Sequence, residues 1–184
     1  MSHVPILWPA EFYDDCEGLF DYVAAGDGAD YDAAYDNTVA LVGNNSIILR
    51  TKLTAPALGD AVSITKRLWL TPLKALNLQF AFSPTTGGAK NLAVSLYWYD
   101  GTNVSTGSIR FNCVPGNVEY LNSVGGWTPM PGVMWKVGTW FWNYCSMLLD
   151  INAATWLPGQ VNQHIIQSDT PALPVAVDAT TGYL

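Results

Sequence analysis

Carboxylates are the side chains from which catalysis would most readily be built, and this chain of 184 residues has few of them outside its first third. Glycoside hydrolysis needs two carboxylates that flank the scissile bond. The chain has three glutamates, Glu11, Glu17 and Glu119, of which the first two lie six residues apart. We interpret their stretch as an edge of the fold with no substrate groove, so the sequence does not predict a glycosidase.

Other catalytic and zinc chemistries lack their residues as well. A serine hydrolase would need a nucleophile in a strained turn such as G-x-S-x-G, and that motif is absent. The cysteines Cys16, Cys113 and Cys145 and the histidines His3 and His164 are too scattered to predict a zinc site. Three cysteines also argue against a complete disulfide framework. We therefore expect a protein that is not an enzyme.

A cluster of aspartates is compatible with a metal site. Residues 26–36 read as a loop that contains four of them: Asp27, Asp30, Asp32 and Asp36. Hard cations such as calcium prefer clustered oxygen ligands, but the spacing does not match an EF-hand. Two interpretations remain at this point, which are a solvated acidic face that aids solubility and a calcium site.

Aromatic side chains are the strongest candidates for a binding surface. We predict a ligand or partner surface formed by Trp8, Tyr97, Tyr99, Tyr120, Trp127, Trp142 and Tyr144. Asparagines lie close to several of them in the chain, as sugar binding would require. Protein interfaces are enriched in the same tyrosines and tryptophans, so the aromatic residues alone do not separate a lectin from an assembly protein.

Strands must position these side chains, and the clearest one covers residues 92–99. Alternate residues of a strand point to opposite faces. One face is apolar and predicts a core stripe, whereas the other carries Tyr97 and Tyr99. A turn is predicted at Asp100-Gly101, and residues 108–114 and 140–150 continue this central block.

The rest of the chain gives further short strand signals. They cover residues 14–18, 39–42, 46–52, 61–70, 76–82, 118–122, 175–177 and the surroundings of Ile165, with a hairpin turn at Gly43-Asn44-Asn45. About ten short strands with turns between them predict an all-β fold, a two-sheet antiparallel β-sandwich or jelly roll. Residues 1–10, with two prolines and Trp8, are predicted to form an extended arm, and residues 11–184 a single domain.

Composition and charge limit the classes of molecule that this protein is expected to bind. Charged residues make up 12% of the chain, against about 25% in typical domains. The net charge is −7, and no Lys or Arg occurs before Arg50 or after Lys136, so we expect no nucleic acid partner. The sequence contains no run of about 18 apolar residues, so it predicts no membrane span. No secretory signal is visible, which favours synthesis in a cytoplasm and release with a virion.

Four motifs occur in an order that resembles the concanavalin A-like lectin/glucanase jelly roll, including laminin-G-like modules. They are Phe12-Tyr13-Asp14-Asp15-Cys16-Glu17, Gly43-Asn44-Asn45-Ser46-Ile47-Ile48-Leu49, Leu96-Tyr97-Trp98-Tyr99-Asp100-Gly101, and the stretch from Gly138-Thr139-Trp140 to Leu148-Leu149-Asp150. The resemblance implies a jelly roll over roughly residues 11–180 and a role as a sugar-binding module, an adhesin or a virion protein. It also implies a closing strand beside the opening one, which the proline-rich end of this chain does not clearly provide.

Enzymes of this family are matched less well. Gln163-His164-Ile165 is similar to the Q-x-H motif of lyases with the same fold, but the tyrosine and arginine motifs that accompany it there are absent. Two functions from different classes follow. The first is a structural protein of a virion, such as a capsid decoration protein, that binds copies of itself or other virion proteins. The alternative is an extracellular carbohydrate-binding module that binds a glycan, with or without calcium.

Overall fold

The computed structural model describes residues 16–27, 30–51, 59–66, 74–84, 91–113, 116–138, 141–166 and 171–177. The predicted arm of residues 1–10, with Trp8, lies outside these ranges. The described residues form thirteen strands, and every strand pair among them is antiparallel. This confirms the all-β prediction. No helix in this part of the chain is long and apolar enough to cross a bilayer.

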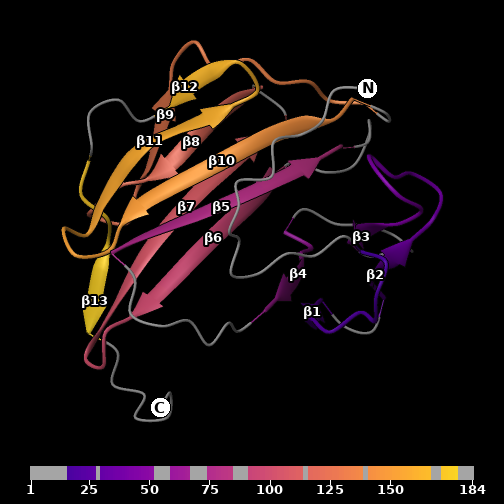
Figure 1. The fold of residues 1–184 in the computed structure, drawn as a ribbon, viewed down its shortest axis with the longest axis horizontal. Helices are drawn as coiled ribbons and strands as arrows, with labels where there is room; N and C mark the ends of the chain where they lie inside the picture. Colours follow the sequence, from indigo (N-terminus) through magenta and orange to yellow (C-terminus); the bar gives the residue numbers. More distant parts are fainter. Residues whose placement is uncertain are drawn as a thin grey trace. The chain divides into compact units, whose positions relative to one another are not determined.

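The chain divides into two compact units, Met1–Thr71 and Pro72–Leu184 (Figure 1). In the first unit, β1 (Val23–Gly26) pairs with β4 (Val62–Thr65), and β2 (Asp32–Asp36) pairs with β3 (Ser46–Arg50). These are two separate two-stranded sheets. The prediction of one domain over residues 11–184 stays a prediction.

The hairpin predicted in the first unit is wrong in one arm. Residues 39–42 form bends, whereas the arm that pairs with β3 is β2, inside the stretch predicted to be a loop. Aspartates at both ends of β2 hid it, because Asp is depleted in strands. Opposite the central alanine and tyrosine of β2 lie Ile48 and Ile47 of β3, and this pairing explains why the strand forms.

The second unit contains two larger sheets. The four-stranded sheet has the order β12 (His164–Ile166), β11 (Thr155–Val161), β10 (Asn143–Asp150) and β5 (Ala75–Phe82). The five-stranded sheet contains β13 (Val175–Val177), β7 (Asn103–Asn112), β8 (Asn117–Leu121), β9 (Trp127–Met130) and β6 (Asn91–Tyr99). Since β6 pairs along nearly the whole of β7, β13 and β8 share the opposite edge of β7. The long arrows in Figure 1 are β5, β6, β7 and β10.

The core of the second unit lies between these two sheets. The rings of Phe82 in β5 and Phe111 in β7 lie 4.4 Å apart, and Phe111 is fully buried. Gly107 in β7 faces Leu149 in β10 so closely that an added Cβ would lie 2.5 Å from a Leu149 methyl carbon. Glycine at this position therefore allows the sheets to approach each other.

The prediction for residues 92–99 is confirmed in its strand and in its faces. Leu92, Val94 and Leu96 pack against the core, while Tyr97 is exposed. The Asp100-Gly101 turn is also confirmed, because the Asp100 carboxylate accepts hydrogen bonds from the backbone N–H of Thr102 and Asn103. However, the described strands belong to four sheets, so a clean two-sheet jelly roll is not shown.

Strand β11 was missed because Pro158 and Gly159 interrupt its pattern. The register with β10 shifts at this point, so that these two residues lie opposite the single residue Met147. This is a β-bulge, one of the few places where a strand accepts proline.

Candidate functional site

The predicted aromatic residues that the structure describes lie in four different places. Tyr97, Tyr99 and Trp127 lie on the outer face of the five-stranded sheet, which points away from the core. Tyr97 is 68% exposed, whereas the Tyr99 hydroxyl donates a hydrogen bond to the Gly101 carbonyl at 2.8 Å. The guanidinium of Arg110 lies 4.4 Å from the centre of the Trp127 ring, a cation–π contact that covers part of that ring.

Polar groups on this outer face are largely paired with one another. The Arg110 Nε donates to the Glu119 carboxylate at 2.7 Å, and a second guanidinium nitrogen forms an ion pair with the same oxygen. Glu119 is only 8% exposed. On the neighbouring row, the hydroxyls of Ser95 and Ser108 lie 2.6 Å apart. We call this surface, with Tyr97 and Trp127, the outer sheet face.

Tyr120 lies on the core side instead of the outer sheet face. It packs against the core, and its ring lies 6.3 Å from that of the buried Trp156. Tyr144 belongs to the other sheet, where the buried residues Cys145 and Met147 show that even-numbered positions of β10 point outward. Partial burial raises the pKa of the Tyr144 hydroxyl.

Trp142 lines a pocket of about 490 Å³ in the second unit. We call it the Trp142 pocket, and its lining residues are Met134, Trp135, Lys136, Phe141, Trp142, Asn143 and Asn162. They come from the connection after β9, the beginning of β10 and the turn between β11 and β12. The sequence predicted only Trp142 of this set as a site residue.

The buried side chain of Asn143 links two of the segments that line the pocket. It is 1% exposed and lies between apolar residues at the beginning of β10. Its Oδ1 accepts hydrogen bonds from the Lys136 backbone N–H at 2.9 Å and from the Asn162 amide at 3.2 Å. Its Nδ2 donates to the Lys136 carbonyl at 2.7 Å. A buried polar side chain requires such partners, and here they fix the connection to β10.

Asn162 completes this network from the turn between β11 and β12. Its φ of 51° lies in the left-handed region, which asparagine tolerates better than most residues. Its Oδ1 accepts from the Tyr144 backbone N–H at 2.9 Å, and its Nδ2 also donates to the Met134 carbonyl at 3.1 Å. The two asparagine amides are thus already bonded to the protein itself.

The remaining walls are aromatic or apolar. Trp135 packs against Phe111, with ring centres 5.6 Å apart, and its Nε1 donates to the Gly116 carbonyl at 3.0 Å. Met134 is 70% exposed and Phe141 is 51% exposed. Among the lining residues Lys136 is the one charged side chain, and its ammonium lies 5.3 Å from the centre of the Phe141 ring. The site therefore presents aromatic rings, a thioether and one cation.

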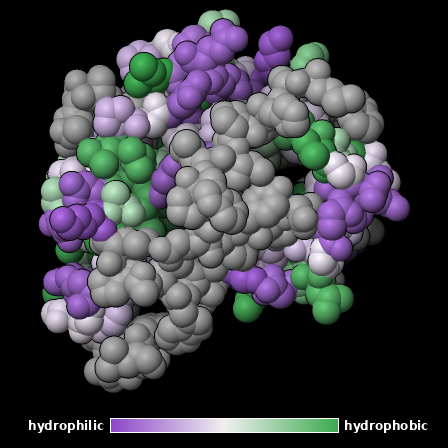
Figure 2. Space-filling model, in the orientation of Figure 1, coloured by the Kyte–Doolittle hydropathy of each residue, from purple (hydrophilic) through white to green (hydrophobic). Residues whose placement is uncertain are grey.

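Apolar side chains also reach the surface elsewhere. Figure 2 shows hydrophobic residues (green) between hydrophilic ones (purple) on the face in view. In the described part of the chain, Leu19 is 90% exposed, Val124 89% and Val42 73%. Single exposed apolar residues are common on proteins, so each needs further evidence before it is assigned a role.

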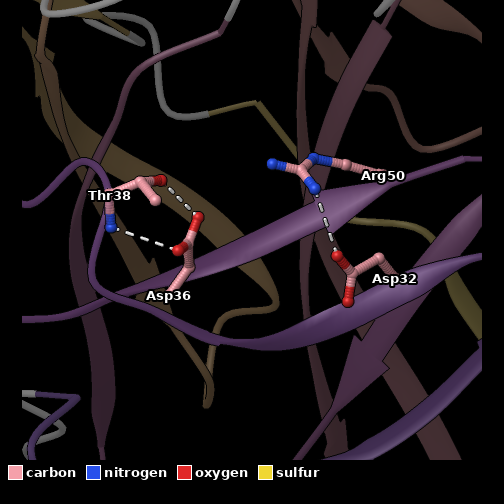
Figure 3. A network of polar contacts seen from close by, with 4 residues as sticks. All are labelled: Asp32, Asp36, Thr38 and Arg50. Atoms are coloured by element: carbon pink, nitrogen blue, oxygen red, sulfur yellow. Dashed lines mark hydrogen bonds and ion pairs between the residues drawn. The ribbon is translucent and has the colours of Figure 1, made fainter.

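The four aspartates of the predicted calcium site are not brought together. Asp27 accepts a hydrogen bond from the Ala61 backbone N–H, and Asp32 forms an ion pair with Arg50 at 3.4 Å. Asp36 accepts hydrogen bonds from the hydroxyl and the backbone N–H of Thr38, which lower its pKa (Figure 3). Within the described ranges, which include Asp30, no group of three or more His, Cys, Asp or Glu residues could hold a metal ion.

The cysteines are free thiols in the described residues, and burial suppresses the ionisation of two of them. Burial raises the pKa of Cys145 to about 12 and also raises that of Cys113. The thiolate is the nucleophilic form, so neither residue is activated for catalysis at neutral pH.

Comparisons with protein-family models, with curated proteins and with solved structures found no match. What is shown is an all-β protein with several antiparallel sheets. The resemblance to the concanavalin A-like family stays a prediction.

Proposed function

We propose that this protein is a non-enzymatic structural component of an assembly, such as a virion decoration protein, and that the Trp142 pocket receives an apolar side chain of a neighbouring protein subunit. The jelly-roll interpretation belongs to the same proposal and applies to the pair of sheets in Pro72–Leu184. The observation that supports it is the distribution of polar groups around the pocket.

A bound sugar needs several hydrogen bonds as well as an aromatic platform. The amides that line the pocket already bond to Lys136, Met134 and Tyr144. This leaves the Lys136 ammonium and the Trp142 indole N–H as the side-chain donors of the pocket. An apolar side chain needs no such donor and gains about 1.5–3 kcal/mol when it is fully buried. Tryptophan, phenylalanine and methionine are also enriched at protein interfaces, where energy concentrates in such pockets.

Sedimentation velocity over a wide range of protein concentration tests this proposal. The wild-type protein is expected to associate as its concentration rises. Met134→Asp places a charge beside the pocket and should suppress this association. Val124→Asp is the matched control, because Val124 is 89% exposed in the turn between β8 and β9 and does not line the pocket. Equal effects of the two substitutions, or a wild-type monomer throughout, would contradict the proposal.

Glycan binding at the outer sheet face is the second candidate, and the exposure of Tyr97 favours it. This ring is 68% exposed, and its partner on β7 is Thr106, whose hydroxyl could bond a sugar stacked on the tyrosine. Trp127 offers less, because Arg110 covers part of its ring. A glycan array with wild type and Tyr97→Ala tests this function. Binding that survives the substitution, or no binding at all, would argue against it.

A further inference from the structure

Leu19 is exposed on the first unit, in a segment whose flanking residues are fixed by polar contacts. Two residues before it, the Glu17 carboxylate accepts hydrogen bonds from the backbone N–H of Asn44 at 2.6 Å and of Asn45 at 3.0 Å. Two residues after it, Asp21 forms an ion pair with Lys66. Leu19 itself is 90% exposed, the highest value among the large apolar side chains of the described residues.

Phe20 anchors the same segment from the other side. Its ring lies 5.4 Å from that of Tyr22 and 5.3 Å from that of Tyr35, the latter edge to face. The segment is therefore fixed before, after and beside Leu19. A side chain presented by an already ordered segment loses less conformational entropy on binding, which favours its use as a contact.

Charge complements the apolar contact. The unit Met1–Thr71 contains ten Asp and Glu residues against four Lys and Arg residues. Of the two acids that flank Leu19, Asp21 is compensated by its ion pair with Lys66, so the Glu17 carboxylate is the one that complements a cation. The Trp142 pocket carries a single charged residue, Lys136, and no acidic one. Opposite charges steer two surfaces toward each other and disfavour wrong partners.

We infer that the neighbour at the Trp142 pocket is a second copy of this chain, with Leu19 as the side chain that enters. This inference rests on the proposed function. We call Leu19 the knob. Because the knob and the Trp142 pocket are different parts of the chain, each copy inserts its knob into one neighbour and receives the knob of another. Such a heterologous interface closes into a ring or grows into a filament, depending on the rotation between copies.

Mixing two complementary variants tests the inference. Leu19→Asp removes the knob and keeps the pocket, whereas Met134→Asp alters the pocket and keeps the knob. Each variant alone should associate at least about tenfold more weakly than wild type, given the free energy of burying one leucine. An equimolar mixture should form a one-to-one dimer that cannot grow, because one intact knob meets one intact pocket. Val42→Asp, on an exposed residue of the same unit, should associate like wild type.

Each other outcome has a definite meaning. Normal association of Leu19→Asp, together with loss of association in Met134→Asp, would overturn the role of Leu19 and leave the pocket as an interface. No dimer in the mixture of two folded monomeric variants would overturn the head-to-tail contact. A wild-type monomer at all concentrations would overturn both the contact between copies and the proposed function, as would intrinsic tryptophan fluorescence that responds only to a glycan. Circular dichroism of both variants checks their fold, which substitution of exposed residues should preserve.

Discussion

Asn143→Ala should destabilise the second unit and loosen the Trp142 pocket. The substitution removes the acceptor for the Lys136 N–H, at 2.9 Å, and the donor for the Lys136 carbonyl, at 2.7 Å. Asn162 loses one of its partners as well, at 3.2 Å, but keeps the Met134 carbonyl. The main loss therefore falls on the two backbone groups of Lys136.

The expected cost follows from these two groups. Each hydrogen bond lost to the partly buried backbone of Lys136 costs about 0.5–1.5 kcal/mol, and removal of the buried Asn143 side chain adds a cavity. We expect the free energy of unfolding to fall by about 3 kcal/mol. Asn143→Leu separates the two contributions, because leucine fills the space but leaves the same backbone groups unpaired. It should therefore recover only a small part of the loss.

Urea denaturation followed by tryptophan fluorescence measures the free energy of unfolding, and amide hydrogen exchange at Lys136 reports on the pocket directly. Asn162→Gly tests the other half of the network, since glycine keeps the left-handed backbone and removes the side-chain amide that bonds Tyr144, Met134 and Asn143. If Asn143→Leu were as stable as wild type and exchange at Lys136 were unchanged, the asparagine network would not be what holds the pocket together.

Three further predictions concern other parts of the chain. Arg110→Ala should lower the free energy of unfolding by about 3 kcal/mol, because it leaves the Glu119 carboxylate, 8% exposed, without its ion pair. Glu119→Ala should cost less, since the more exposed Arg110 can be hydrated, and urea denaturation of both variants would show the reverse order if this reasoning failed. Gly107→Ala should cost about 1–3 kcal/mol by overpacking against Leu149, and the smaller side chain of a second substitution, Leu149→Val, should restore part of it in thermal unfolding. The bonds from Asn44 and Asn45 hold the pKa of Glu17 below its ordinary value, so they stabilise the folded state above the unfolded pKa of about 4.3 and are lost as pH falls through the lower folded pKa. The protection factors of the Asn44 and Asn45 amides, which correct for the intrinsic pH dependence of exchange, should therefore fall only in acid, and Glu17→Gln should remove this acid-dependent loss of protection.

Local patterns predicted strands best where alternation was regular. The faces of residues 92–99 followed directly from their sequence, because apolar and polar positions alternate without interruption. The same reasoning failed where a tertiary contact decided the outcome. Strand β2 is stabilised by pairing with β3 despite its aspartates, and β11 accommodates Pro158 and Gly159 through a bulge. Tyr120 shares the face of the buried Val118, two residues before it, so the alternation of residues 117–120 already indicates the core side, and the register with β7 then places it beside Ile109.

The pocket could not be found from aromatic residues alone. Its walls come from segments as far apart as Met134 and Asn162, which only the pairing of β10 with β11 brings together. One signal was present in the sequence, namely Asn143, an amide between Trp142 and Tyr144 at the start of β10. Such a residue must find partners when it is buried. It therefore marks a place where a connection is tied to the sheet.

The same network also bears on function. An aromatic pocket with unused amides would suit a sugar, whereas one whose amides are committed to the backbone keeps fewer hydrogen-bond donors and acceptors for a sugar. The amides of Asn143 and Asn162 bond to the protein itself, which supports the proposed protein contact, and under that proposal Lys136 favours an acidic group in the partner. Under the proposed contact, the exposed Leu19 supplies the apolar side chain and the nearby Glu17 carboxylate supplies the negative charge. For this reason we expect substitutions in the pocket to lower the mass of the associated protein in sedimentation velocity and to leave its response to glycans unchanged.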